Sequence, residues 1–177
     1  LELVAETLRY SLNQLAVVAP HWLTEWLPDE WLERYASRME EAKFPHEESQ
    51  RQRLMQTIAE DGLHLLSRLL DNHSPTFLKQ LPVVHLLWRL WIEQYEQVAG
   101  KIAWRQAGNL PPAALMINSP YDAEARFSRK RNTSWTGYKA HVSETCDEEL
   151  PHLLTHVETT PATEPDCQTL ATIHQAL

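Results

Sequence analysis

The sequence predicts a mainly α-helical protein with a small α/β portion toward its C-terminal end. Up to about residue 100, apolar side chains recur every three or four residues, which is the spacing of one face of a helix. From residue 135 to 145 the period changes to two, as in a half-buried strand. Hydrophobic residues make up 43% of the 177 residues, so the chain can bury one good core, or one core and an appendage.

Helices are predicted along the first hundred residues, and prolines mark where several of them begin. Pro20, Pro28 and Pro82 can each stand in a first turn, where the missing N–H costs nothing. Gly100 is expected to end the last of these helices. The predicted helices cover residues 2–19, 21–27, 28–35, about 48–70 and 82–99. The clearest apolar stripe, expected in the core, consists of Val84, Leu87, Trp88, Trp91, Ile92 and Tyr95.

The remainder of the chain has a different pattern, with strands, turns and one further helix. A short strand is possible at 102–105, and Pro165 and Asp166 begin a helix that is still running at Leu177. In the strand at 135–145, alternate residues point to opposite faces. One face carries Tyr138, Ala140 and Val142, and the other Lys139, His141 and Ser143. An acidic turn at 146–151 precedes a second strand at 153–159.

The domain boundary is placed near residue 106. Residues 1–105 form an α-helical region, and residues 106–177 contain a basic loop, two strands and the start of a helix. Two strands and a helix are too little to fold well alone, so we expect a piece of a larger α/β sheet.

Charge is strongly segregated along the chain. The net charge is −8, but residues 101–141 carry seven basic and two acidic groups, while residues 142–177 carry seven acidic groups and neither Lys nor Arg. Overall acidity argues against wholesale coating of nucleic acid, whereas the middle block is a local positive patch. Its basic residues are interleaved with Phe127, Trp135 and Tyr138, which suits a phosphate backbone with exposed bases. The alternative is a solvated loop whose aromatic rings pack beneath it.

Three other groups of residues are candidate sites. Lys139 and His141 share a strand face and could approach a phosphate or orient a carboxylate, or simply face solvent. Asp122 and Glu124 could bind a metal or transfer protons, but a turn with local ion pairs to Arg126 or Arg129 is the favoured interpretation. A zinc site would need residues of suitable type at a known spacing, and the spacing here fits no common pattern. The residues concerned are His141, Cys146, His152 and His156.

Composition also bears on the compartment. Two cysteines do not form a disulfide framework, and no apolar run approaches the roughly 18 residues that cross a bilayer. We therefore expect a cytoplasmic protein without a membrane partner. The sequence contains no GxSxG, Walker A or dinucleotide motif, and its four glycines offer little material for a phosphate-cradling loop.

The segment from Ser119 to Thr163 resembles the DDE transposases of bacterial insertion sequences. The resemblance extends to residues 1–9 and to the helical region between, and so spans nearly the whole chain. The matching runs are residues 119–126, 130–131, 135–141, 144–146, 151–153 and 157–163. It implies an RNase H-like fold with a helical insertion, and a function in DNA binding and strand transfer. In this family three carboxylates hold two divalent metals that activate the attacking water or 3′-hydroxyl.

The resemblance also implies that the chain is an internal fragment without the carboxylate triad. The first Asp of the triad would precede Leu1, and the others would follow the helix beginning at Asp166; neither Asp122 nor Asp166 matches a triad position. We therefore expect no catalytic or metal-binding residue in this chain, no activity and no cofactor for it alone, and Mg²⁺ for the full-length parent. The expected partners are DNA at transposon ends and either a second copy of the chain or full-length transposase. The expected DNA contacts are Arg126, Arg129, Lys130, Arg131, Trp135, Lys139 and His141.

A non-enzymatic alternative remains open. The chain could be a helical interaction module, or a transposase remnant that binds DNA or the full-length transposase. Self-association or capture of a partner without DNA would favour this alternative.

Overall fold

A computed structural model describes residues 1–177 except 147, 148 and 150. The expected acidic turn at 146–151 therefore lies partly outside the described residues. The chain divides into two compact units, Leu1–Pro111 and Pro112–Leu177. Helices account for 51% and strands for 19%, with two small antiparallel sheets, which confirms a mainly helical chain with a smaller β portion.

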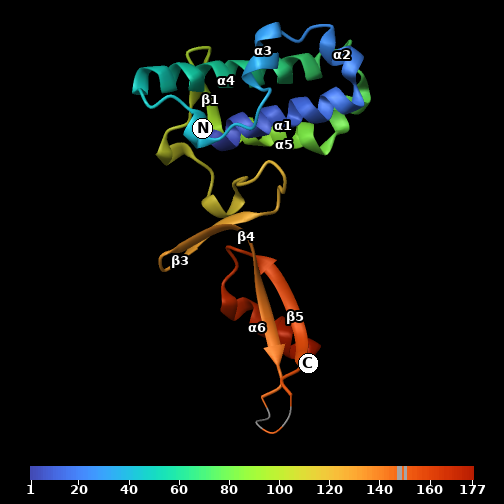
Figure 1. Ribbon diagram of the computed structural model, residues 1–177, viewed down its shortest axis with the longest axis vertical. Coiled ribbons are helices and arrows are strands. Elements are labelled where there is room, and N and C mark those ends of the chain that lie inside the picture. Colours follow the sequence, from blue (N-terminus) through green and yellow to red (C-terminus); the bar gives the residue numbers. More distant parts are fainter. Residues whose placement is uncertain (147–148, 150) are drawn as a thin grey trace. The chain divides into compact units, whose positions relative to one another are not determined.

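The first unit is a helical assembly in which α1, α4 and α5 lie side by side (Figure 1). Short 3-10 turns at Glu41–Lys43, Thr76–Gln80 and Ala107–Asn109 interrupt its connections. Its helices and strands are α1 (Glu2–Val18), α2 (Pro20–Thr24), α3 (Asp29–Arg34), α4 (Glu48–Leu70), α5 (Pro82–Gln94), β1 (Tyr95–Val98) and β2 (Lys101–Trp104).

The core of this unit lies where the apolar faces of the three long helices meet. Leu8 and Leu15 of α1, Leu65 of α4, and Leu87 and Leu90 of α5 are all fully buried. Packing of these faces, rather than local propensity, supplies most of the stability of such helices.

The end of α5 differs from the prediction. The helix stops at Gln94, and Gly100 lies in the turn of the β1–β2 hairpin. Ala99 and Gly100 both have positive φ angles, 50° and 79°, as a two-residue hairpin turn of this hand requires. Trp88 and Ile92, predicted in the core, are 41% and 54% exposed because α1 and α4 cover the two neighbouring sides of α5 instead.

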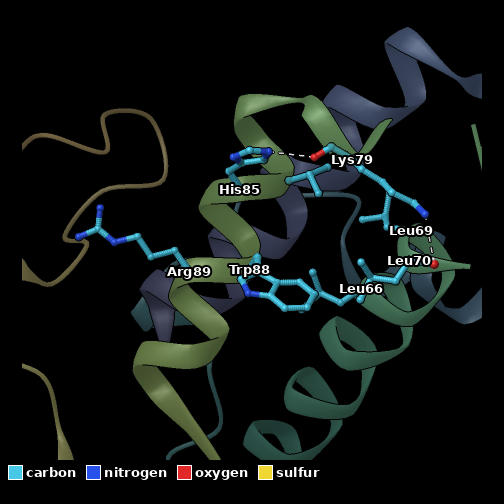
Figure 2. A pocket seen from close by; sticks show the side chains of 8 residues that line it. Leu66, Leu69, Leu70, Lys79, His85, Trp88 and Arg89 are labelled. Atoms are coloured by element: carbon cyan, nitrogen blue, oxygen red, sulfur yellow. Dashed lines mark hydrogen bonds between the residues drawn. The ribbon is translucent and has the colours of Figure 1, made fainter. Parts of the chain in front are cut away.

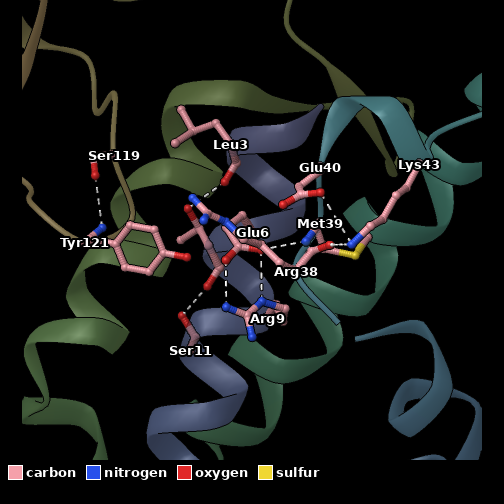
Figure 3. Close-up of polar contacts among 11 residues, drawn as sticks. Leu3, Glu6, Arg9, Ser11, Arg38, Met39, Glu40, Lys43, Ser119 and Tyr121 are labelled. Atoms are coloured by element: carbon pink, nitrogen blue, oxygen red, sulfur yellow. Dashed lines mark hydrogen bonds and ion pairs between the residues drawn. The ribbon is translucent and has the colours of Figure 1, made fainter. Parts of the chain in front are cut away.

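A buried carboxylate, Glu6, and a half-buried one, Asp61, join elements of the first unit through polar contacts. Glu6 on α1 is 4% exposed and accepts hydrogen bonds from Arg9 at 2.7 and 2.9 Å and from the backbone N–H of Met39 at 2.8 Å (Figure 3). Asp61 on α4 pairs with Arg34 and accepts the Tyr35 hydroxyl at 2.7 Å. Burial raises the pKa of both Asp61 and Tyr35. Buried charges tolerate such positions only when paired in this way.

The second unit is a three-stranded antiparallel sheet with one helix, in the order β3–β4–β5. The expected basic loop is largely strand β3, which pairs with the first half of β4. The sequence of β3, Arg-Phe-Ser-Arg-Lys, has no apolar alternation, so the strand is recognised only from its pairing with β4. The elements are a 3-10 turn at Ala113–Leu115, β3 (Arg126–Lys130), β4 (Thr133–Glu144), β5 (Leu154–Pro161) and α6 (Asp166–Ala176).

The two faces of this sheet differ in burial as the sequence period predicts. Lys139, His141 and Ser143 are half-buried, on the side where α6 packs beside β5. The opposite face, with Tyr138 and Val142, is exposed. The polar face of the sheet is thus the covered one, and the more apolar face is open.

Candidate nucleic-acid interface

The tip of the β3–β4 hairpin presents three consecutive basic side chains, Arg129, Lys130 and Arg131, which we call the basic tip. All three are exposed. Lys130 pairs across the hairpin with Thr133, leaving Arg131 and Asn132 as a two-residue turn. Arg131 has a φ of 56°, a left-handed conformation that favours glycine. A non-glycine residue held there carries backbone strain, and such strain is concentrated at functional sites.

Within the described part of the chain, the two arginines of the basic tip have no acidic partner. Arg129 Nε donates to the carbonyl of Arg131 at 3.3 Å. Their charges are therefore available to an anionic ligand.

Lys130 and Lys139 converge on one carboxylate, Asp166, in the first turn of α6. Lys139 Nζ lies 2.9 Å from Asp166 Oδ1 and also donates to the carbonyl of Glu164, while Lys130 Nζ lies 3.3 Å from Asp166 Oδ2. The hydrogen bond from Lys139, followed by that from Lys130, lowers the pKa of Asp166. Asp166 thus neutralises part of the positive patch and fixes α6 against the hairpin.

His141 belongs to the same half-buried face as Lys139. Its Nε2 lies 3.1 Å from the hydroxyl of Thr160 on β5, and Thr160 is only 6% exposed. Lys139 and His141 thus each have a protein partner on the face of the sheet that α6 covers. A phosphate could reach them only from the edge of that face.

Arg126 and Trp135 are both engaged by backbone carbonyls. Arg126 donates from Nε to Ala114 at 3.0 Å and from Nη1 to Ala123 at 2.7 Å and Ala125 at 3.0 Å. These bonds fix the plane of its guanidinium at the start of β3. The half-buried Trp135 donates its indole N–H to the carbonyl of Tyr138 at 3.2 Å.

The carboxylate of Asp122 organises the turn before β3 and holds Tyr138. It accepts the backbone N–H groups of Glu124 at 2.9 Å and Ala125 at 3.1 Å, and the Tyr138 hydroxyl at 2.9 and 3.1 Å. The N–H of Glu124 is the main cause that lowers the pKa of Asp122, and the bond to Asp122 raises the pKa of Tyr138. The carboxylate therefore organises a turn, as expected, but the partners given by the described residues are backbone N–H groups and Tyr138 rather than the expected Arg126 or Arg129.

The residues considered for zinc have other neighbours in the structure. His152 lies 3.7 Å from Glu144, and His156 lies 3.3 Å from Glu158. Among the described residues, no three His, Cys, Asp or Glu side chains come together as a metal-binding group.

Sequence reasoning did not identify Asp166 as the partner of the two lysines, or Asp122 as the partner of the Tyr138 hydroxyl. Asp166 lies 27 residues from Lys139 and 36 from Lys130, and no local pattern links such positions. The period of two does place Tyr138 opposite to Lys139, which was the available signal.

No protein-family model, curated protein or solved structure matches this chain. None of the helices in the described residues is long and apolar enough to cross a membrane.

Proposed function

We propose that this chain is part of a DDE transposase with an RNase H-like core, and that its second unit binds DNA phosphates through the basic tip. The resemblance at residues 119–163 suggests the family. Strands β4 and β5 pair and are followed along the chain by α6, an order that is compatible with the implied fold. The observation that carries the proposal is the basic tip itself, in which Arg129 at the end of β3 and Arg131 in the strained turn are exposed and have no acidic partner among the described residues. Cations so placed suit a phosphate backbone.

Strand transfer belongs, in this proposal, to the full-length parent. Mg²⁺ prefers several free carboxylate or water oxygens. The candidates here are engaged otherwise, since Asp122 holds Tyr138 and a turn, and Asp166 holds two lysines. We therefore do not propose Asp122 or Asp166 as Mg²⁺ ligands, and DNA binding is the function that we propose for this chain.

The test is the salt dependence of binding to a fully paired DNA duplex. Arg129, Lys130 and Arg131 are replaced together by Gln, and fluorescence anisotropy gives Kd between about 50 and about 200 mM salt. Each lost phosphate contact lowers the slope of log K against log salt by about 0.9, so the triple variant should lose about 1.8 through its two arginines, because Lys130 is already paired with Asp166. The side chains are exposed, so folding should be unaffected.

A matched control removes the same charge from the first unit. Lys43, Arg53 and Lys101 are exposed, and their replacement by Gln should leave the slope near that of the wild type. Equal slopes for the two triple variants would exclude the basic tip as the binding surface.

A helical interaction module is the second candidate, favoured by an apolar pocket of about 490 Å³ between α4 and α5. Leu66 and Leu69 line it, and Trp88 reaches across from α5 (Figure 2). Leu70 is 49% and Trp88 41% exposed, which is unusual for large apolar groups that share one pocket. Concentration-dependent sedimentation of the whole chain without DNA would favour this function.

A further inference from the structure

A second pocket, of about 460 Å³, opens on the uncovered face of the β3–β4–β5 sheet, and we call it the Tyr138 pocket. Its volume is within the range of small-ligand sites. Unlike the pocket between α4 and α5, its lining includes a carboxylate and threonine hydroxyls beside the aromatic ring. The side chains relevant to binding are Glu124, Arg126, Tyr138, Thr159 and Thr163.

Tyr138 is held as a fixed aromatic platform in this pocket. The ring is 40% exposed, while its hydroxyl is tied to both oxygens of Asp122. Asp122 is in turn fixed by the backbone N–H groups of Glu124 and Ala125. A ring already positioned in this way loses little conformational freedom when a flat ligand stacks on it.

The polar groups around the ring match the edge and the charge of a nucleotide. Arg126 brings a guanidinium fixed by three carbonyls, whose charge those neutral partners do not cancel. Glu124 is exposed and can accept from an exocyclic amino group, as carboxylates do with cytosine. The hydroxyls of Thr159 and Thr163 can donate or accept.

We propose that the Tyr138 pocket takes one unpaired base of a DNA strand, stacked on Tyr138, with the adjoining phosphate near Arg126. Stacking on an aromatic ring requires a base removed from its duplex partner. Arg129 lies three residues from Arg126 on β3, about 10 Å along a strand, so the same DNA strand can pass the basic tip. This inference rests on the proposed DNA binding and adds the class of substrate, DNA with an unpaired base.

The experiment compares two duplexes that are identical except for one bulged, unpaired base. The wild type should bind the bulged duplex more tightly, measured as a ratio of Kd values at one salt concentration. Tyr138→Leu should reduce that ratio by about fivefold or more, because base stacking on an aromatic ring contributes at least that much. Tyr138→Phe keeps the ring and should retain most of the preference.

Phe127→Leu is the matched control. Phe127 is 51% exposed on β3, on the same hairpin, and does not line the pocket. Its loss should leave the preference unchanged. Equal effects of Phe127→Leu and Tyr138→Leu, or of Tyr138→Phe and Tyr138→Leu, would overturn stacking on Tyr138.

The two proposals fail in different ways. If paired duplex binds with the predicted salt slope at the basic tip but the wild type shows no preference for the bulge, the pocket proposal is wrong and DNA binding stands. If neither duplex binds, both proposals are wrong.

Discussion

Replacing Gly62 by alanine tests the packing of α4 against α5 directly. A Cβ at this position would lie 1.8 Å from Cζ2 and 2.2 Å from Cε2 of Trp91, far inside any real carbon–carbon contact. Trp91 is 4% exposed, and its Nε1 donates to the carbonyl of Ala59 at 3.1 Å. The ring therefore cannot move aside without breaking that bond or leaving the core.

The expected magnitude is the difference between two opposing effects. At an open helical site, Gly→Ala stabilises by about 1 kcal/mol through backbone entropy. Overpacking a buried site costs about 1 to 3 kcal/mol, and a clash with a rigid ring belongs at the upper end. Gly62→Ala should therefore lose about 2 kcal/mol net, which lowers Tm by about 8 °C for a unit of roughly 100 residues.

Urea and thermal unfolding followed by circular dichroism give the measurement, since the signal does not depend on tryptophan. Trp91→Phe removes the clashing atoms, so the double variant should recover stability, with a coupling energy of about 0.5 to 3 kcal/mol. Gly108→Ala meets no atom within 4 Å and should stay within about 0.5 kcal/mol of the wild type. A Gly62→Ala protein as stable as the wild type would refute the packing described here.

Two further predictions concern the hairpin. Arg131→Gly should stabilise the second unit by about 1 kcal/mol, because glycine adopts positive φ without strain. The same change should weaken DNA binding, because it removes one cation of the basic tip. Urea unfolding measures the first effect and fluorescence anisotropy the second, and unchanged or lower stability would contradict the assigned strain. Asp166→Asn should steepen the salt slope for DNA by up to about 1.8 at neutral pH, since it frees Lys130 and Lys139. Because the folded-state pKa of Asp166 is lowered from 3.8, its ion pairs stabilise the fold above that pH and are lost as the pH falls through the lowered value. Thermal unfolding of the wild type and Asp166→Asn as a function of pH should then converge in acid, and a constant difference would contradict this assignment.

Local patterns predicted much of the secondary structure. The helix expected at about 48–70 is α4, Glu48–Leu70, because its apolar period is unbroken and loop residues flank it. The strand expected at 135–145 is β4, Thr133–Glu144, for the same reason at a period of two. The end of α5 was misplaced, since the hairpin turn at Ala99 and Gly100 is stabilised by pairing with β2, which no local pattern reveals.

The sequence by itself determined where the positive charge lies, and that Lys139 and Tyr138 occupy opposite faces of one strand. Both follow from composition and from the alternation of a strand. Only the tertiary structure decided which of these charges are neutralised, because the partner of Lys130 and Lys139 is Asp166, far along the chain. The same holds for Gly62 beside Trp91 and for Tyr138 on Asp122. Such contacts depend on how whole elements meet in space, whereas periodicity reports only the face on which a residue lies.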